Sequence, residues 1–360
     1  MDLRSTLKKM IDSDASDLHL KLGISPILRI NGELTPLKVD SLNKEDLRRV
    51  ASSLMTKEQQ TRFVNEKEAD FGTGIPGLSR FRVNIYIQRG SIAIAIRPIP
   101  RDIKTIEELN LPVILMDLAF TVRGLILVTG TTGSGKSTTL SAMIEHINKN
   151  KRKHIITIED PIEYLFNDAK STISQREVGN DTKSFASSLK YILRQDPDII
   201  MIGEIRDMET MEVALKAADT GHLIFSTLHT LNASETVNRI ISFFPPYQYQ
   251  HIRILLSSVL KGIISQRLLT RKDGSGRIPA TEILVSTPTI REYLLDEIKT
   301  LLIPEAINDG KQYHMHSFDQ QIMSLYKEGI IDLQSALDNS TNPDEFKMRL
   351  RGIEQSSARW

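Results

Sequence analysis

Residues 128–137 read Val-Thr-Gly-Thr-Thr-Gly-Ser-Gly-Lys-Ser, and this stretch decides the fold that we expect. From Gly130 onward it fits the pattern G-x-x-x-x-G-K-[ST], in which a glycine-rich loop turns backbone N–H groups inward around phosphates. Lys136 is expected to reach the β and γ phosphates, and the Ser137 hydroxyl is placed to ligate Mg²⁺. The residues expected to bind the nucleotide are Gly130, Thr131, Thr132, Gly133, Ser134, Gly135, Lys136, Ser137 and Thr138.

The segments on both sides of this loop agree with that prediction. Residues 124–128 read as a short buried strand, and residues 138–148 read as a helix whose N-terminus would face the anion. A glycine turn without a ligand is the alternative, and the order of strand, loop and helix argues against it.

Downstream of the loop, strand patterns alternate with helix patterns. Such alternation predicts an α/β domain with a parallel sheet and helices on both faces, and ligands of such sheets bind beyond the carboxyl ends of the strands. The expected strands are 125–128, 154–158, 199–202 and 223–226, and the expected helices are 184–193 and 208–219. Beyond them we expect a helix at 252–269, a strand at 277–285 and mostly helices from Thr289.

Upstream of the loop, the pattern is that of a smaller α+β domain. We expect a helix at 3–11, a strand at 17–22, a helix at 42–65, and hairpins at 26–37 and 80–97. The pair Asn31-Gly32 favours a type I′ turn in the first hairpin. The expected division is a domain at 1–100, a proline-containing linker at 101–112, and an ATPase-type domain at 113–360 with a helical region from about 286; residues 355–360 are expected to form a frayed tail.

Composition limits the classes of protein that remain. The 360 residues carry a formal net charge of +1, which argues against a general nucleic-acid binder. Without cysteine there can be neither disulfides nor thiolate zinc sites. No apolar run reaches about 18 residues, so we expect no direct membrane insertion and a cytoplasmic location.

Acidic residues follow two of the expected strands. Residues 198–204 form an apolar strand that ends in Glu204, which is expected to act on the metal side of the site, with Ser137 as the other Mg²⁺ ligand. Glu163 is our choice for the base that activates water, supported by Glu159 and Asp160. A solvated acidic turn is the alternative for this second group.

Four further side chains are candidates for the site. His222 and His229 bracket the strand 223–226, so we expect both at the same edge of the sheet, in the site or in a subunit contact. Arg82 and Arg97 have no partner within their own strands, and we expect them to act as arginine fingers; surface arginines that keep a sheet soluble are the alternative. His314 and His316 are expected to be solvated.

Taken together, these motifs resemble the secretion-ATPase superfamily, and within it the type IV pilus retraction ATPases. The similarity spans nearly the whole chain and is carried by residues 15–20, 80–84, 95–97, 130–137, 158–163, 193–198, 203–207 and 220–230. The resemblance implies a homohexamer of PAS-like N-terminal and RecA-like C-terminal domains that bind ATP at domain and subunit boundaries. In such proteins residues 159–163 correspond to an Asp box and residues 220–229 to a His box.

The resemblance also implies a motor that turns a platform protein of the inner membrane, so that pilin subunits leave the fibre. Pilus-extension and type II secretion ATPases carry additional N-terminal domains and usually a four-cysteine zinc module, which favours the retraction branch for this chain. The segment 289–297 matches the retraction motif A-I-R-N-L-I-R-E only in part, retaining Arg291 and the apolar spacing. An accessory pilus ATPase therefore stays open as an alternative. Less favoured alternatives are a pilus-extension or secretion ATPase, a nucleic-acid motor and a non-catalytic scaffold.

Overall fold

The computed structural model describes residues 1–100 and 102–351, and the chain divides into two compact units. The first unit comprises Met1–Asp102 together with two later segments, Glu159–Leu165 and Arg176–Lys183. The second comprises Ile103–Ile158, Phe166–Gln175 and the chain from Ser184 onward. Arg101 of the expected linker and the expected tail at 355–360 lie outside the described residues.

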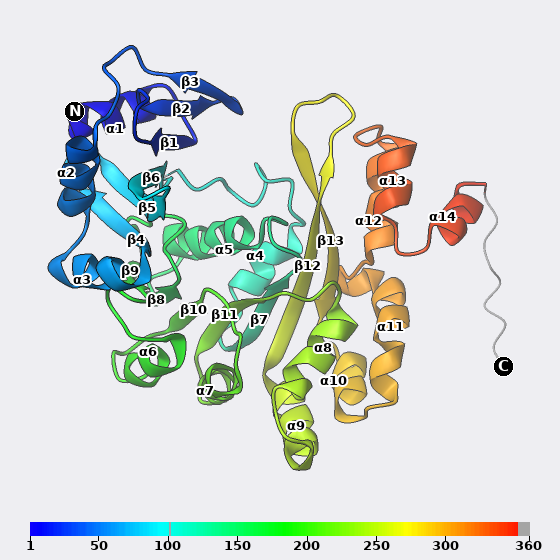
Figure 1. Cartoon of the computed structure of the whole chain (residues 1–360). Helices are drawn as coiled ribbons and strands as arrows, with labels where there is room; N and C mark the ends of the chain where they lie inside the picture. Colours follow the sequence, from blue (N-terminus) through cyan, green and yellow to red (C-terminus); the bar gives the residue numbers. More distant parts are fainter. Residues whose placement is uncertain (101, 352–360) are drawn as a thin grey trace. The chain divides into compact units, whose positions relative to one another are not determined.

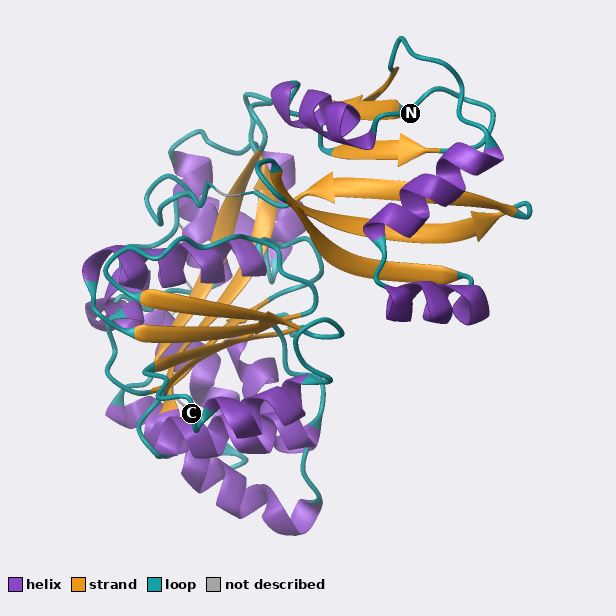
Figure 2. Ribbon diagram, turned by 90° about the vertical axis from the view of Figure 1, so that its left-hand side faces the viewer, coloured by secondary structure: helices purple, strands orange, loops and turns teal. Residues whose placement is uncertain are grey.

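The first unit is built on an antiparallel sheet with the strand order β3-β2-β1-β6-β5-β4 (Figure 2). Both expected hairpins are confirmed, and positive φ angles at Asn31 (50°) and Gly32 (87°) agree with the predicted type I′ turn. The strands are β1 (Asp17–Leu20), β2 (Ile27–Ile30), β3 (Glu33–Pro36), β4 (Glu68–Ile75), β5 (Ser79–Gln88) and β6 (Ser91–Pro98). Strand β4 was not expected, because its two glycines and its acidic residues interrupt the strand pattern.

Three helices pack on one face of this sheet, and their apolar side chains join those of the strands in one core. They are α1 (Leu3–Asp12), α2 (Lys44–Leu54) and α3 (Lys57–Glu66). The expectation of a single helix at 42–65 is wrong. Thr56 begins a new helix, because its hydroxyl accepts the Gln59 N–H while the Gln59 side chain accepts the Thr56 N–H, which forms a capping box.

The second unit contains a sheet with the strand order β13-β12-β7-β11-β10-β8-β9, which is mixed and not purely parallel as expected. Strands β12, β7, β11, β10 and β8 are mutually parallel, and β13 is antiparallel to β12. The strands are β7 (Gly124–Thr129), β8 (His154–Glu159), β9 (Thr172–Glu177), β10 (Ile199–Ile202), β11 (Leu223–Leu228), β12 (Leu260–Thr270) and β13 (Arg277–Val285). The predicted α/β fold class is confirmed.

Helices cover both faces of this sheet (Figure 1). Helix α5 (Lys136–Asn150) packs with α4 (Ile114–Ala119) on one face, while α6 (Phe185–Ile192), α7 (Met208–Asp219) and α9 (Tyr249–Val259) lie on the other. Helix α8 (Ala233–Ser242) follows β11 and packs on β12 and β13. Ile106 and Leu111, which precede α4, are also buried in the core of this unit.

The prediction of one helix at 252–269 is wrong, because the helix ends at Val259 and strand β12 begins at the next residue. Residues 260–266 are almost all buried, since β12 lies between β7 and β13 inside the sheet. A strand that is buried on both faces reads as a continuous apolar run, and such a run cannot be told from a buried helix by its period alone.

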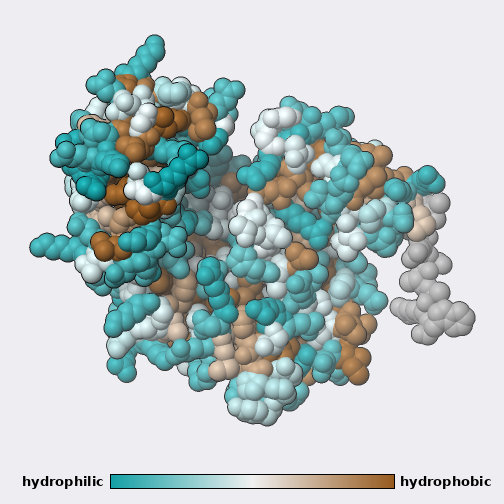
Figure 3. Space-filling view, viewed as in Figure 1, coloured by the Kyte–Doolittle hydropathy of each residue, from teal (hydrophilic) through white to brown (hydrophobic). Residues whose placement is uncertain are grey.

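The C-terminal part is helical, as expected, and adds a small core on β12 and β13. Its helices are α10 (Pro288–Leu295), α11 (Ile303–Asp309), α12 (Phe318–Lys327), α13 (Leu333–Asn339) and α14 (Pro343–Leu350). Short 3-10 turns occupy Pro246–Gln248, Lys299–Leu302 and Lys311–Tyr313. Apolar side chains gather on the surface around α10 and α11 (Figure 3), where Ile298 and Leu301 are 77% and 70% exposed.

The two C-terminal histidines differ in environment. His314 is exposed, as expected, but His316 is half-buried and its Nε2 lies 3.0 Å from Thr281 Oγ1 and 3.1 Å from Gln321 Oε1. The expectation of a solvated side chain is therefore wrong for His316. Within residues 1–100 and 102–351, no helix has the length and apolar character needed to cross a bilayer.

Candidate nucleotide-binding site

The loop that joins β7 to α5 has the backbone conformation that its glycines permit. Gly130, Gly133 and Gly135 have φ angles of 144°, 80° and 92°, which side-chain-bearing residues rarely adopt. At Gly130 the space is also closed, because a Cβ would lie 2.4 Å from the backbone oxygen of Gln266 and 2.5 Å from Ser134 Oγ. The loop therefore needs glycine at this position for two independent reasons.

Positive charge and N–H groups converge at this loop. The Lys136 ammonium donates to the carbonyl oxygens of Gly130 and Thr131, both at 2.9 Å, and only 8% of the residue is exposed. Helix α5 begins at Lys136, and no side chain of the described residues caps its N-terminus. The positive end of its dipole can therefore stabilise an anion.

A further polar group fits the same ligand. The Ser134 hydroxyl is buried and has no hydrogen-bond partner among the described residues. A buried hydroxyl without a partner is costly, so a ligand oxygen at this point would be stabilising. The cradle of N–H groups, the buried ammonium and this hydroxyl together fit a nucleoside polyphosphate.

Two cavities, of about 260 and 290 Å³, adjoin the loop. Gln266, Leu268 and Arg277 line both of them. Since Ser265 of β12 pairs with Thr129 of β7, Gln266 comes beside Gly130, and its Oε1 accepts the Thr139 hydroxyl at 2.7 Å. Sequence reasoning missed Gln266 and Arg277: it placed Gln266 in a helix, and nothing in the sequence connected either residue to the phosphate loop.

Glu204 and His229 meet at the carboxyl ends of neighbouring strands. Glu204 follows β10 and His229 follows β11, and His229 Nε2 lies 3.3 Å from Glu204 Oε2. The other carboxylate oxygen, Oε1, pairs with Arg206 Nη2 at 2.5 Å. Because Leu228 pairs with Thr129, these side chains share the sheet edge from which the phosphate loop begins.

His222 does not share this edge. It precedes β11 (Leu223–Leu228) and His229 follows that strand, so the two histidines lie at opposite ends of six extended residues, roughly 20 Å apart. The Nδ1 atom of His222 lies 3.0 Å from the Ala217 carbonyl oxygen, at the end of α7. The expectation that both histidines reach one edge is therefore wrong.

Glu159, Asp160 and Glu163 lie in a segment of the first unit, together with Arg82. Glu159 is buried, whereas Asp160 and Glu163 are exposed. Arg82 forms a bidentate ion pair with Asp70 of β4, with N–O distances of 2.7 and 3.1 Å. This hydrogen bonding raises the pKa of the Arg82 guanidinium, and the charges of Glu163 and Asp160 raise it further.

Arg97 also has an acidic partner, which the sequence did not reveal. Its Nη2 and Nε donate to Asp17 Oδ1 of β1 at 2.7 and 3.0 Å. Both candidate arginines are therefore paired with carboxylates of neighbouring strands. Such exposed pairs contribute little stability, about 0 to 1 kcal/mol, so another anion can replace the partner at small cost.

A parallel sheet with a glycine-rich phosphate loop at its carboxyl edge, a buried lysine and an acid on a neighbouring strand define a P-loop ATPase. Residues 105–312 match the family model described as "Type II/IV secretion system protein". The chain belongs to this family, as a PilT-like secretion ATPase.

Two relatives and one solved structure extend this similarity to the first unit. The chain is 40% identical to the Pseudomonas aeruginosa type IV pilus retraction ATPase PilT, covering 96% of this chain and 100% of that protein. It is 39% identical to the type IV pilus ATPase PilU of the same organism, over 99% and 94%. A crystal structure of the pilus retraction motor PilT with bound ADP is 44% identical, with a TM-score of 0.88 over 96% of this chain and 98% of that chain.

Proposed function

We propose that this chain is a homohexameric motor that hydrolyses Mg-ATP and drives type IV pilus retraction, and thereby twitching motility. The observation that carries the proposal is the similarity to PilT over both units, combined with an intact phosphate loop at the sheet edge. Hydrolysis would rotate N-terminal units against C-terminal ones and so turn a platform protein of the inner membrane. The motor would be cytoplasmic and would reach the membrane only through that machine.

In the proposed mechanism each side chain has one task. Gly130 to Thr138 hold the phosphates through N–H groups, and the Lys136 ammonium exchanges its bonds to loop carbonyls for the β and γ phosphates. Bound Mg²⁺ would supply charge neutralisation at those phosphates, held by the Ser137 hydroxyl on the loop side and by Glu204 from β10. His229, 3.3 Å from Glu204, orients that carboxylate.

The first unit would contribute the remaining groups. Glu163 would accept a proton from the attacking water, with Glu159 and Asp160 as its neighbours in the same segment. Arg82 and Arg97 would leave Asp70 and Asp17 to meet the γ-phosphate of ATP when a unit closes, on their own subunit or an adjacent one. His222, at the opposite end of β11, fits a subunit contact better than a nucleotide contact.

A second candidate function is that of an accessory pilus ATPase of the PilU kind. The identities to PilT and PilU differ by one percentage point, which supports both assignments about equally. The segment that partly matches the retraction motif forms α10, where Ile290 and Leu294 are buried and Arg291 is exposed. The helix thus keeps the spacing of the motif's apolar residues, but it lacks the motif's Asn and its second Arg.

The enzymatic proposal is tested with three variants of the purified protein. Lys136→Ala and Glu204→Ala should abolish ATP turnover, while Glu163→Gln should bind ATP with unchanged affinity and hydrolyse it about 10² to 10⁴ times more slowly. Robust hydrolysis by Lys136→Ala would contradict the site, and loss of ATP binding in Glu163→Gln would make Glu163 a structural acid. Deletion and complementation, scored by twitching, separates the main motor from the accessory one.

A further inference from the structure

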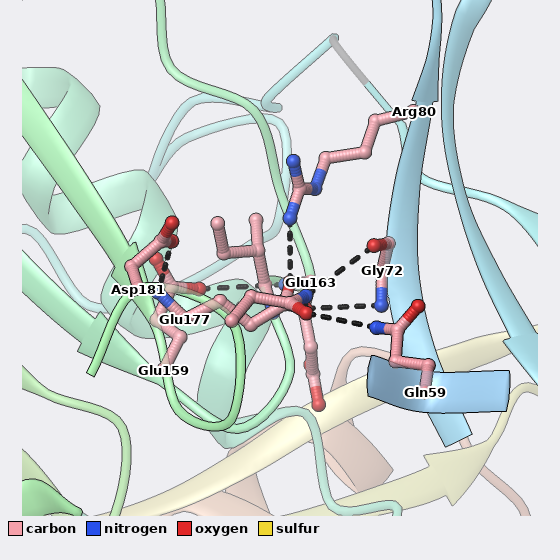
Figure 4. A network of polar contacts seen from close by, with 9 residues as sticks. Gln59, Gly72, Arg80, Glu159, Glu163, Glu177 and Asp181 are labelled. Carbon is pink, nitrogen blue, oxygen red and sulfur yellow. Dashed lines mark hydrogen bonds and ion pairs between the residues drawn. The ribbon is translucent and has the colours of Figure 1, made fainter. Parts of the chain in front are cut away.

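Glu177 is a buried carboxylate to which the mechanism above gives no task. It is the last residue of β9 and is 1% exposed, and each of its two carboxylate oxygens accepts hydrogen bonds from N–H groups (Figure 4). Oε1 accepts the Gly72 N–H at 3.0 Å and the Asn180 side-chain amide. Oε2 accepts Arg80 Nη2 at 2.9 Å and the Ile162 N–H at 3.3 Å.

The sheet of the first unit makes room for this carboxylate. Gly72 of β4 pairs with Arg82 of β5, and Gly74 pairs with Arg80, so these four residues share one face of the sheet. A Cβ at Gly72 would lie 2.5 Å from Glu177 Oε2 and 2.8 Å from Oε1. The carboxylate thus occupies the space that a side chain at residue 72 would fill.

The same residue is attached to the acidic segment. Its Oε2 accepts the Ile162 N–H, one residue before Glu163, and the next residue, Val178, donates its N–H to the Glu159 carbonyl oxygen at 2.8 Å. Glu177 is in turn held by Asp181, whose carboxylate accepts the Glu177 N–H at 2.8 Å. Segment 159–163 is therefore joined to strands β4 and β5 through one side chain.

We propose that Glu177 is a positioning residue, which fastens the segment that carries Glu163 to the face of the N-terminal sheet that carries Arg82. The carboxylate acts through Ile162 and Arg80 and does not touch the nucleotide. Glu163 then keeps a fixed place relative to Arg82 whenever the first unit moves. This inference rests on the role proposed above for Glu163.

The donor set explains why a carboxylate is required. A glutamine at residue 177 would direct its NH₂ group at one pair of donors, either Gly72 and Asn180 or Arg80 and Ile162. One half of the junction would be lost in either orientation. Since a misplacement of about 1 Å can lower a catalytic rate by roughly 10²-fold, Glu177→Gln should lower kcat for ATP about 10- to 100-fold. The KM for ATP should stay within about threefold, because the phosphate loop is unchanged.

Two glycines of β4 provide a matched pair of variants. Gly72→Ala places a methyl group on the Glu177 carboxylate, whereas a Cβ at Gly74, two residues along on the same face, meets no atom within 4 Å. Neither glycine has a positive φ, so neither substitution strains the backbone. Gly72→Ala should reproduce the fall in kcat, and Gly74→Ala should retain the kcat of the unmodified protein.

A second measurement does not depend on activity. Amide hydrogen exchange of residues 159–165 should become at least about tenfold faster in Glu177→Gln and Gly72→Ala, with no change in the phosphate loop. The double variant Gly72→Ala/Glu177→Gln should be no slower in catalysis than the worse single variant, since both remove the same junction. If Glu177→Gln does not fold, the two glycine variants carry the test.

The proposal is overturned if Gly72→Ala keeps both its kcat and its exchange protection at 159–165, or if Gly74→Ala loses them to the same extent. Failure of the proposed function has a different signature. If Glu163→Gln turns over ATP as fast as the unmodified protein, Glu163 is not the base. Exchange at 159–165 then still decides whether Glu177 fastens the segment.

Discussion

Alanine at Gly130 should weaken nucleotide binding much more than alanine at Gly133 does. Both residues have positive φ angles, of 144° and 80°, but a Cβ at Gly133 meets no atom within 4 Å. The cost at Gly133 is then backbone strain alone, about 1 to 2 kcal/mol. Because a free loop can relax out of the strained conformation and a loop wrapped around phosphates cannot, this cost should raise the Kd for ADP about 5- to 30-fold.

At Gly130 the strain is joined by overlap with a backbone atom that cannot rotate away. The Cβ would lie 2.4 Å from the Gln266 oxygen, on a strand buried in the sheet. Strain of about 1 to 3 kcal/mol and overpacking of about 1 to 3 kcal/mol together predict that the Kd for ADP rises more than about 30-fold.

Isothermal titration with ADP measures both variants without hydrolysis, and a thermal unfolding scan reports whether each is folded. Gly329→Ala is the matched control, because residue 329 has a φ of 74°, no atom within 4 Å of a Cβ, and a position after α12 away from the loop. It should retain the affinity of the unmodified protein. A folded Gly130→Ala protein that binds ADP as tightly as Gly133→Ala would refute the reasoning.

Two further predictions concern stability. Burial lowers the pKa of the His316 imidazole below its ordinary value of about 6.5, and the hydrogen bonds that the imidazole makes to Gln321 and Thr281 oppose this shift only in part. The unfolded chain therefore takes up a proton that the folded chain resists. This contribution to the free energy of unfolding should be fully present above about pH 6.5 and be lost as the pH falls through the folded pKa; His316→Gln should flatten that dependence, measured by denaturant titration against an exposed control, His314→Gln. Arg206→Ala should lower the melting temperature only slightly, corresponding to about 0 to 1 kcal/mol, because the Arg206 side chain is 69% exposed in its pair with Glu204; calorimetry showing a much larger loss would mean that the pair is structural.

The phosphate loop and its flanking elements could be predicted because local rules agree there. The strand β7, the glycines with positive φ and the helix α5 are each specified by neighbouring residues, so motif and structure coincide. The sheet edge at which Glu204 and His229 lie could be predicted for a related reason, since each follows a parallel strand and the carboxyl ends of such strands share an edge. That the two side chains contact each other was not predicted.

The errors arose where non-local pairing decides the outcome. Strand β12 was read as helix because its apolar run is buried between two strands, and only its partners β7 and β13 distinguish the two conformations. The prediction for His222 is wrong because two residues that flank one strand lie at its opposite ends, and only the residue after the strand, His229, lies at the carboxyl edge of the sheet. The partners Asp70 and Asp17 were invisible for the same reason, since register between strands fixes them.

Glu177 shows the limit of motif reading most clearly. It lies in a polar stretch, 175–177, that resembles no phosphate or metal pattern, and its importance depends on the absent side chain of Gly72, 105 residues earlier. Sequence spacing contains no information about such a junction. The register of β4 and β5 is needed, because it places Gly72 and Arg80 on one face of the sheet.

The chain passes between its two units several times, and this has consequences for protein engineering and for evolution. Backbone crossings between the units fall at 102/103, 158/159, 165/166, 175/176 and 183/184, which makes five. A fragment that ends at residue 102 would retain Arg82 but lack Glu159–Leu165 and Arg176–Lys183, the two later segments that complete the first unit. A single recombination point therefore cannot replace one unit by that of a homologue, and a chimaera needs several matched junctions. We expect the sequences of the two units to evolve together.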